Sequence, residues 1–133
     1  MQLTRHTDYA LRLLMHLAEG EDGRTSIADV ASGQDISRTH LMKIASELAR
    51  GGFIAATRGR GGGIRLARRP EEINLGAVVR LMEGNCKLVD CTGCKLARNC
   101  RLPGVLDQAL DAFLAVLDNH SLGDALRRRK AAA

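Results

Sequence analysis

Three stretches in the first fifty residues place apolar side chains at helical spacing. The first spans roughly residues 4–20, the second follows Ser26, and the third follows Ser37 and stops at Gly51-Gly52. The pattern predicts three amphipathic helices, with the two serines in the position of N-caps. Two helices joined by a tight turn, here at residues 34–36, are typical of a helix-turn-helix.

A basic hairpin is predicted directly after the third helix. Residues 53–57 and 64–67 are short apolar runs, and the turn between them reads Arg58-Gly59-Arg60-Gly61-Gly62-Gly63. Two such runs around a glycine-rich turn predict a two-stranded wing on the helix-turn-helix. Pro70 closes this module, so we expect a DNA-binding domain over residues 1–70.

The remainder of the chain, residues 71–133, is expected to form a second unit. A fourth helix is predicted over residues 73–83, and residues 84–102 show no periodicity. The predicted fifth helix, residues 104–118, has apolar positions separated by four, three and four residues: Leu106, Leu110, Phe113 and Leu117. This spacing resembles a coiled-coil seam and favours a homodimer. The expected fold is mainly α, a winged helix-turn-helix with a two-stranded wing and a long C-terminal dimerisation helix.

Positive charge is concentrated in the first half of the chain. The net charge is +5, and residues 1–70 contain 11 Lys or Arg against 7 Asp or Glu, whereas residues 71–133 contain 9 against 8. This asymmetry is expected if the first half meets a polyanion. No apolar run approaches the ~18–20 residues that span a bilayer, and the start of the chain does not have the pattern of a signal peptide. We therefore expect a cytoplasmic protein without a membrane partner.

Polar and basic residues of the third helix and of the wing are the candidates for binding double-stranded DNA. Side chains of this size can reach base edges and phosphates in the major groove, and arginine at a hairpin tip suits the narrow, negative minor groove. The simpler alternative is a solvated basic surface. A P-loop is not expected, because that motif opens a helix and here a strand follows. The candidates are Ser37, Arg38, Thr39, His40 and Lys43 in the helix, and Arg58 and Arg60 in the wing.

All four cysteines lie close together, in the order Cys86-x4-Cys91-x2-Cys94-x5-Cys100. In a reducing compartment such clustering indicates a metal or redox site rather than disulfides. Spacing alone leaves three alternatives: a structural zinc site, an iron–sulfur cluster, or free sensing thiols. The pattern contains no arrangement that points to catalysis, so no enzyme activity is expected. A small redox module without DNA binding is a rival interpretation, but it leaves the wing arginines unexplained.

Four segments resemble the winged-helix iron–sulfur regulators, a family that includes the IscR, RirA and NsrR types. They are the opening Met-Gln-Leu-Thr-x-x-Thr-Asp-Tyr-Ala-Leu-Arg, the wing segment of residues 58–66, Cys100-Arg101-Leu102, and the segment of residues 117–124. The resemblance covers nearly the whole chain. Within the family it is similar to the nitric-oxide-sensing NsrR branch, because IscR-type proteins place a His three residues after the last Cys, where this chain has Pro103.

The resemblance implies a homodimeric repressor that binds operator DNA and releases it when nitric oxide attacks the cluster. It implies Cys91, Cys94 and Cys100 as thiolate ligands of an iron–sulfur cluster, with 4Fe-4S favoured over 2Fe-2S. It also implies that Asp8 of the partner subunit is the fourth ligand. From the residues alone, Asp8 at a helix start has the ordinary role of stabilising the helix dipole.

The chain departs from the family pattern at its cysteines. The gap between Cys91 and Cys94 is shorter than is usual in the family, and Cys86 is additional. Cys86 could therefore replace Asp8 as the fourth ligand. Iron sensing of the RirA type, and a thiol-based or zinc-containing winged-helix regulator, also stay open.

Overall fold

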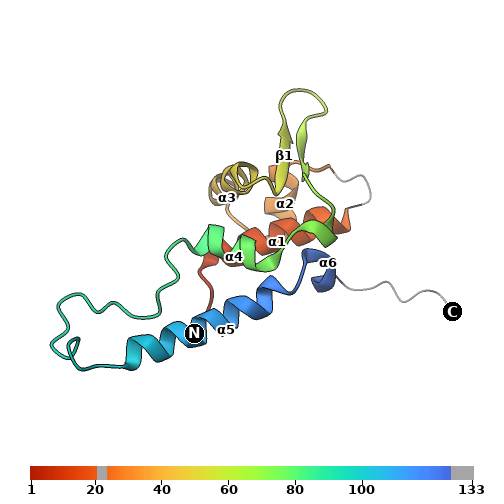
Figure 1. Ribbon diagram of the computed structural model, residues 1–133. Helices are drawn as coiled ribbons and strands as arrows, with labels where there is room; N and C mark the ends of the chain where they lie inside the picture. The colour runs from red at the N-terminus through yellow and green to blue at the C-terminus, as the bar shows by residue number, and fades with distance from the viewer. Residues whose placement is uncertain (21–23, 127–133) are drawn as a thin grey trace.

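The computed structural model describes residues 1–20 and 24–126, with a small hairpin standing on one side of a group of short helices (Figure 1). The first three helices are α1 (Arg5–Glu19), α2 (Ile27–Gln34) and α3 (Arg38–Arg50). Each starts at a hydroxyl side chain that accepts a hydrogen bond from a backbone N–H of the first turn; these are Thr4, Ser26 and Ser37. The predicted helices of the helix-turn-helix are confirmed.

The predicted two-stranded wing is also confirmed. Strands β1 (Ile54–Thr57) and β2 (Gly63–Leu66) pair antiparallel, with Ile54 opposite Leu66 and Thr57 opposite Gly63. Ile54 and Ile64 are buried, so the hairpin is fastened to the helices by one apolar face. The segment before α2 adds a single bridge to the hairpin, between Thr25 and Ile64.

The C-terminal half contains η1 (Pro70–Glu72), α4 (Leu75–Glu83), α5 (Leu102–Asp118) and α6 (Leu122–Ala125). The fourth helix begins two residues later than predicted, because the chain first pairs with the segment after α5. The carbonyl of Ile73 accepts a hydrogen bond from the N–H of Leu122 at 2.8 Å. The fifth helix begins earlier than predicted, since Pro103 is tolerated in a first helical turn.

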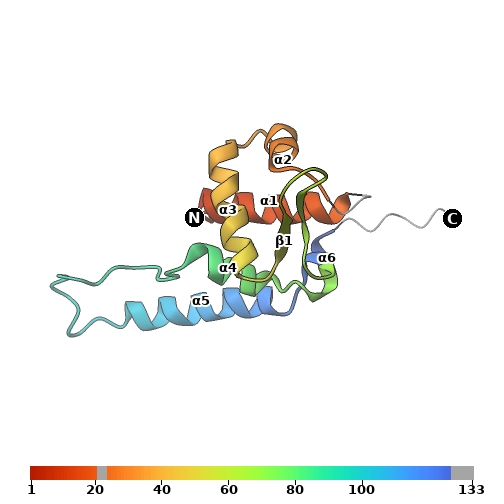
Figure 2. The same ribbon diagram turned by 90° about the horizontal axis from the view of Figure 1, so that it is seen from above.

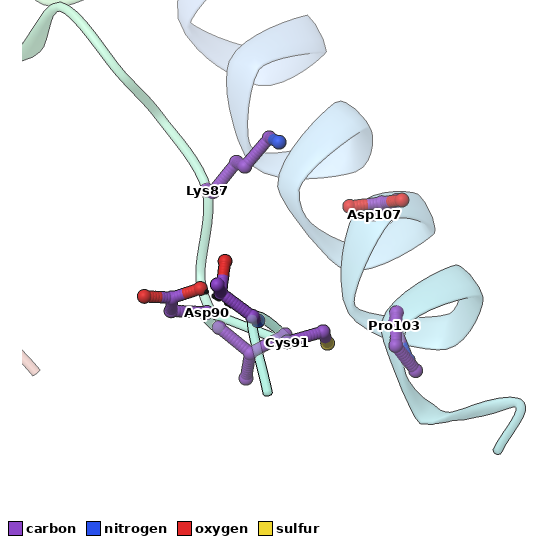
Figure 3. Close-up of a pocket in the computed structure, with 7 residues that line it drawn as sticks. Lys87, Asp90, Cys91, Pro103 and Asp107 are labelled. Carbon is purple, nitrogen blue, oxygen red and sulfur yellow. Dashed lines mark hydrogen bonds between the residues drawn. The ribbon is translucent and has the colours of Figure 1, made fainter. Parts of the chain in front are cut away.

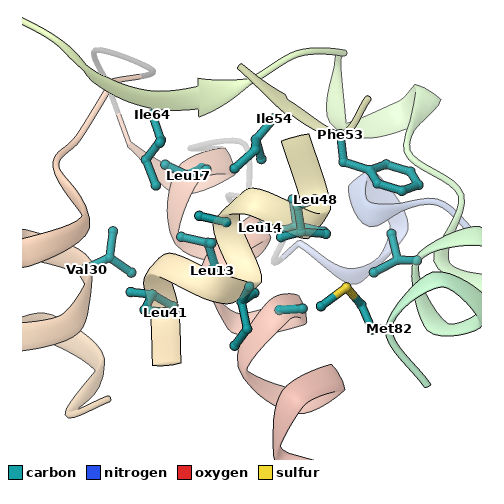
Figure 4. Packing of buried hydrophobic residues seen from close by; sticks show 14 of the residues in the cluster. Leu13, Leu14, Leu17, Val30, Leu41, Leu48, Phe53, Ile54, Ile64 and Met82 are labelled. Carbon is teal, nitrogen blue, oxygen red and sulfur yellow. The ribbon is translucent and has the colours of Figure 1, made fainter. Parts of the chain in front are cut away.

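The hydrophobic core lies among α1, α3, the hairpin and α4 (Figure 4). Its fully buried side chains include Leu13 and Leu14 of α1 and Leu41, Ile44 and Leu48 of α3. Four other members come from beyond residue 70: Ile73, Val78, Met82 and Leu122. Because core residues lie on both sides of that position, the division into units at residue 70 stays a prediction. The last seven residues of the second unit, 127–133, lie outside the described residues.

Helix α5 and the segment before it extend away from this core (Figures 1 and 2). We call residues 84–101, between α4 and α5, the cysteine loop. Of the expected seam, Leu106, Leu110 and Leu117 are half-buried within their own chain, and only Phe113 is exposed. In the part of the chain that the structure describes, no helix has both the length and the hydropathy needed to cross a membrane.

Candidate nucleic-acid interface and cysteine loop

Helix α3 has one buried and one exposed face. Leu41, Ile44 and Leu48 are fully buried, which fixes the helix on the core. Its opposite face begins at the N-cap and carries the expected DNA-binding side chains Ser37, Arg38, Thr39 and Lys43, all exposed, together with Met42 and Ser46. α3 is the second helix of the helix-turn-helix, and a polar exposed face on that helix is what a recognition helix needs to enter a major groove.

His40 is placed differently from the other candidates on α3. It is half-buried, and its ring stacks on His6 of α1, with centroids 5.6 Å apart and planes 14° apart. Tyr9 contacts the same ring edge-on at 5.3 Å. The structure therefore directs His40 toward α1, and its predicted contact with DNA stays a prediction.

The carboxylate of Glu47 is held against α1. His6 Nε2 lies 2.7 Å from Glu47 Oε2, and this hydrogen bond is the main cause of a lowered pKa for Glu47. Glu47 is the one acidic residue in the sequence of α3. Because Glu47 is turned toward His6 of α1, the exposed face of α3 carries no acidic side chain and suits a phosphate backbone.

The wing presents Arg58 and Arg60, both exposed, on a turn that Gly62 N–H closes by donating to Gly59 O at 2.9 Å. A side chain that the sequence did not single out braces this turn. Arg24 Nη1 donates to the carbonyl of Gly61 at 2.6 Å. No local pattern links residues so far apart in the chain, so only the fold could identify this contact.

The cysteine loop holds all four thiols as free cysteines. Cys86 is half-buried, whereas Cys91, Cys94 and Cys100 are exposed. A turn joins the closest pair: the N–H of Cys94 donates to the carbonyl of Cys91 at 3.1 Å, and Gly93 between them takes a φ of 72° that favours glycine. The two-residue gap therefore corresponds to one tight turn.

The loop folds back on the first turns of α5 and encloses a shallow hollow there (Figure 3). Its walls are Lys87, Val89, Asp90, Cys91 and Thr92 of the loop, and Pro103 and Asp107 of α5. Cys91 points across this hollow toward the start of α5, and Cys100 lies two residues before that helix. Even so, within residues 1–20 and 24–126, no three His, Cys, Asp or Glu side chains are grouped closely enough to hold a metal ion.

Asp8 is not among the cysteines in the single chain. Its carboxylate accepts two hydrogen bonds of 3.0 Å from Arg12, one turn further along α1. The side chain of Arg12 is 51% exposed and that of Asp8 is 43% exposed. The structure thus gives Asp8 an ion pair on a free surface of α1, and the sequence prediction that it is a cluster ligand is neither supported nor contradicted by this geometry.

The base of the cysteine loop is tied to the start of α1. Glu83, the last residue of α4, accepts a hydrogen bond from the backbone N–H of Thr4 at 2.8 Å and a second from its hydroxyl at 3.3 Å. The sequence analysis missed this link, since 79 residues separate the two side chains. The helix that carries Asp8 is therefore joined both to the loop through Glu83 and to α3 through His6.

Comparison with known proteins assigns the family. The Rrf2 profile, described as an iron-dependent transcriptional regulator, matches residues 3–128. The HTH-type transcriptional regulator NsrR of Geobacillus kaustophilus is 50% identical, with 97% of this chain and 92% of that protein covered. The NsrR of Bacillus subtilis is 43% identical, with coverages of 98% and 93%.

Solved structures agree with this assignment. CymR, the global cysteine regulator of B. subtilis, superposes with a TM-score of 0.75 at 27% identity, covering 94% of this chain and 95% of that one. IscR of T. potens has a TM-score of 0.76 at 25% identity, with coverages of 94% and 85%. These relatives are transcriptional regulators and not enzymes, as the sequence predicted. The chain therefore belongs to the Rrf2 family of DNA-binding transcriptional regulators, as an NsrR-type member.

Proposed function

We propose that this regulator is a cytoplasmic homodimer that represses transcription while an iron–sulfur cluster is held on its cysteine loop, and that nitric oxide relieves the repression. The observation that carries the proposal is the set of four free thiols gathered in a loop that contributes nothing to the hydrophobic core of the described residues. Such a loop can change conformation without unfolding the DNA-binding part.

The side chains of the loop fit an iron–sulfur cluster in kind. Thiolates are the ligands that such clusters prefer, and Cys91, Cys94 and Cys100 are exposed and free of disulfides. When bound, the cluster, most simply of the 4Fe-4S type, supplies iron sites that react with nitric oxide. A turn joins Cys91 to Cys94, and Cys100 lies two residues before α5, so all three proposed ligands belong to one loop.

Two residues compete for the fourth position. Asp8 of the partner subunit could supply a carboxylate, and it would have to exchange its ion pair with Arg12 for the metal. Cys86 is the alternative, on the same loop and half-buried. A carboxylate bond to iron is weaker than a thiolate bond, so Asp8 would leave one corner of the cluster open to a small molecule.

Helix α5 is the proposed dimer contact. One face of it exposes apolar side chains separated by three and four residues in alternation: Leu102, Val105, Ala109, Ala112 and Val116, with Phe113 beside them. Leu102, Val105 and Val116 are 55%, 59% and 60% exposed. This is the a/d spacing of a helix that packs on a second helix, and a copy of the same chain presents a matching stripe.

Two contacts connect the cysteine loop with α3, the helix proposed to bind DNA. The loop base is held to α1 by Glu83 and Thr4, and α1 is held to α3 by His6 and Glu47. A change in the loop can therefore shift α3 in each subunit. Two α3 helices must match half-sites about one helical turn apart, so a small shift lowers operator affinity.

The decisive experiment is an anaerobic titration of the purified protein with nitric oxide. Visible absorption reports the cluster, and retardation of a duplex selected from a random library by the protein reports DNA binding. We expect both signals to fall together. Asp8→Ala and Cys86→Ala, compared in the same titration, identify the fourth ligand by which one weakens the cluster bands. Loss of the bands with DNA binding unchanged would overturn the sensing mechanism, and a response to iron depletion alone would favour iron sensing.

A further inference from the structure

The C-terminal end of α5 is locked onto α4 by a bidentate ion pair. Arg80 Nη2 donates to Asp118 Oδ2 at 2.8 Å, and Arg80 Nη1 donates to Asp118 Oδ1. Asn74, the N-cap of α4, donates its amide to the backbone carbonyl of Asp118 at 2.7 Å. Asp118 is the last residue of α5, so these contacts grip the helix at one end.

The absence of a side chain at Gly76 leaves room for the Asp118 carboxylate in this pair. Gly76 of α4 faces Asp118 so closely that a Cβ there would collide with the carboxylate. The chain beyond α5 continues the attachment, since Leu75 N–H donates to His120 O at 3.0 Å. Arg80 and Asp118 are nevertheless 47% and 40% exposed. An ion pair this exposed adds little to stability, so the close fit indicates a geometric role.

The geometry makes α5 a lever. Its 17 residues span about 25 Å, whereas the nine residues of α4 span only about 14 Å, so the first half of α5 runs beyond α4 (Figure 2). Among its inner side chains, only Leu114, near the anchored end, is buried, with 8% of its surface exposed. A tilt of about 10° at the anchor would move the far end by about 4 Å. One base pair advances a half-site by a similar distance, about 3.4 Å.

We infer that Arg80 and Asp118 fix the angle between α5 and the winged helix, and thereby set the half-site spacing that the dimer recognises. The inference rests on the proposed function, since it needs a dimer formed through α5. The pair makes no hydrogen bond to the outer face of α3, and Cys86 is the one cysteine whose charge contributes to the raised pKa of Arg80 among the described residues. The expected effect of the pair is therefore on the distance between the two α3 helices of the dimer and not on the DNA contacts of one α3.

The test compares binding to duplexes of altered spacing. A site selected by the wild-type protein from a random library is remade with one or two base pairs inserted or removed at its centre. We expect the wild type to lose about tenfold in affinity per step, and Arg80→Met and Asp118→Asn to flatten this dependence to within about threefold. Arg80→Lys keeps the positive charge but loses the bidentate geometry of the guanidinium. Its dependence on spacing should lie between that of the wild type and that of Arg80→Met.

Two controls separate the possible failures. Glu19→Gln removes an equal charge from the exposed C-terminal end of α1, away from Arg80 and Asp118, and should keep the wild-type spacing profile. Binding to a single half-site and the dimer mass should be unchanged in all variants. If Arg80→Met and Asp118→Asn are folded dimers that keep the wild-type profile, the inference is wrong. If the wild-type protein is a monomer, or if it binds no DNA duplex, the proposed function is wrong and the inference about Arg80 and Asp118 is not the cause of the failure.

Discussion

His6 of α1 and Glu47 of α3 meet at 2.7 Å, between side chains that are only 21% and 22% exposed. The contact joins the first helix of the chain to α3, the helix proposed to bind DNA. The His6 ring also stacks on His40, so the N-terminal turn of α1 contacts α3 both in its first turn and in its C-terminal half. Its energetic weight can be tested without any knowledge of the operator.

Replacing Glu47 with Gln should lower the free energy of unfolding by about 1 kcal/mol, the usual contribution of a hydrogen bond to a charged or polar partner. The lowered pKa of Glu47 adds a pH signature. A depressed carboxyl pKa contributes stability above the unfolded value, here 4.5, and the contribution is lost as pH falls through the lower folded value. Denaturant unfolding at several pH values should therefore show a difference between the two proteins that is constant above about pH 5.5 and shrinks below about pH 4.5.

Ser46→Ala is the matched control, because Ser46 is an exposed neighbour on the same helix. Its stability should stay within about 0.5 kcal/mol of the wild type at every pH. An equal loss in both variants, or a difference that grows in acid, would contradict the role given to Glu47.

Arg60→Ala in the wing should weaken DNA binding about tenfold and reduce the salt dependence of binding by about one unit of slope. The reason is the loss of one exposed cation at the tip of the hairpin. Fluorescence anisotropy across a range of salt concentrations measures both effects. Arg98→Ala removes the same charge from the cysteine loop, at the other end of the molecule, and should leave affinity and slope unchanged (Figure 1).

Arg38→Ala should act on sequence preference as well as on affinity. Arg38 opens the exposed face of α3, where base edges can be reached, so its loss should cost roughly 1–3 kcal/mol and relax selection at one base pair of each half-site. Repeating the library selection with the variant reports the change. Arg50→Ala, at the far end of the same helix, should preserve the selected sequence; a selection unaltered by Arg38→Ala would remove this residue from base readout.

Val105→Glu should dissociate the proposed dimer, because it places a charge in the exposed apolar stripe of α5. Sedimentation equilibrium should report a monomer, with a circular dichroism spectrum like that of the wild type, since Val105 is 59% exposed and outside the core. Ala115→Glu, on a different exposed face of α5, should remain dimeric. Dimers in both variants would exclude this stripe as the contact.

The elements of the fold were largely predictable because local signals mark them. Hydroxyl N-caps, periodic apolar positions and a glycine-rich turn each act over a few residues, and they defined α2, α3 and the wing. The partner of an apolar stripe is not a local property. The sequence therefore assigned Leu106 and Leu110 to a dimer seam, although they are half-buried in their own chain and the exposed stripe is centred one position away.

The same limit applies to the candidate site. Residue type and position relative to the apolar stripe predicted that Arg38, Lys43 and the wing arginines lie on the surface, and they are exposed. His40 lies one turn from the helix start and looks equivalent in sequence, but packing against His6 and Tyr9 turns it inward. Contacts such as Thr4 with Glu83 depend on the whole fold. The ligand set at the cysteines stays a prediction, because spacing does not determine which metal or which fourth ligand is used.

The cysteine loop contributes no side chain to the core cluster of the described residues, and it leaves the fold at Glu83 and returns at Leu102. Its sequence is therefore released from the packing constraints that restrict the rest of the chain. Substitutions within the loop should therefore carry almost no folding penalty. The loop can therefore diverge in sequence while the helices and the wing that form the core keep theirs.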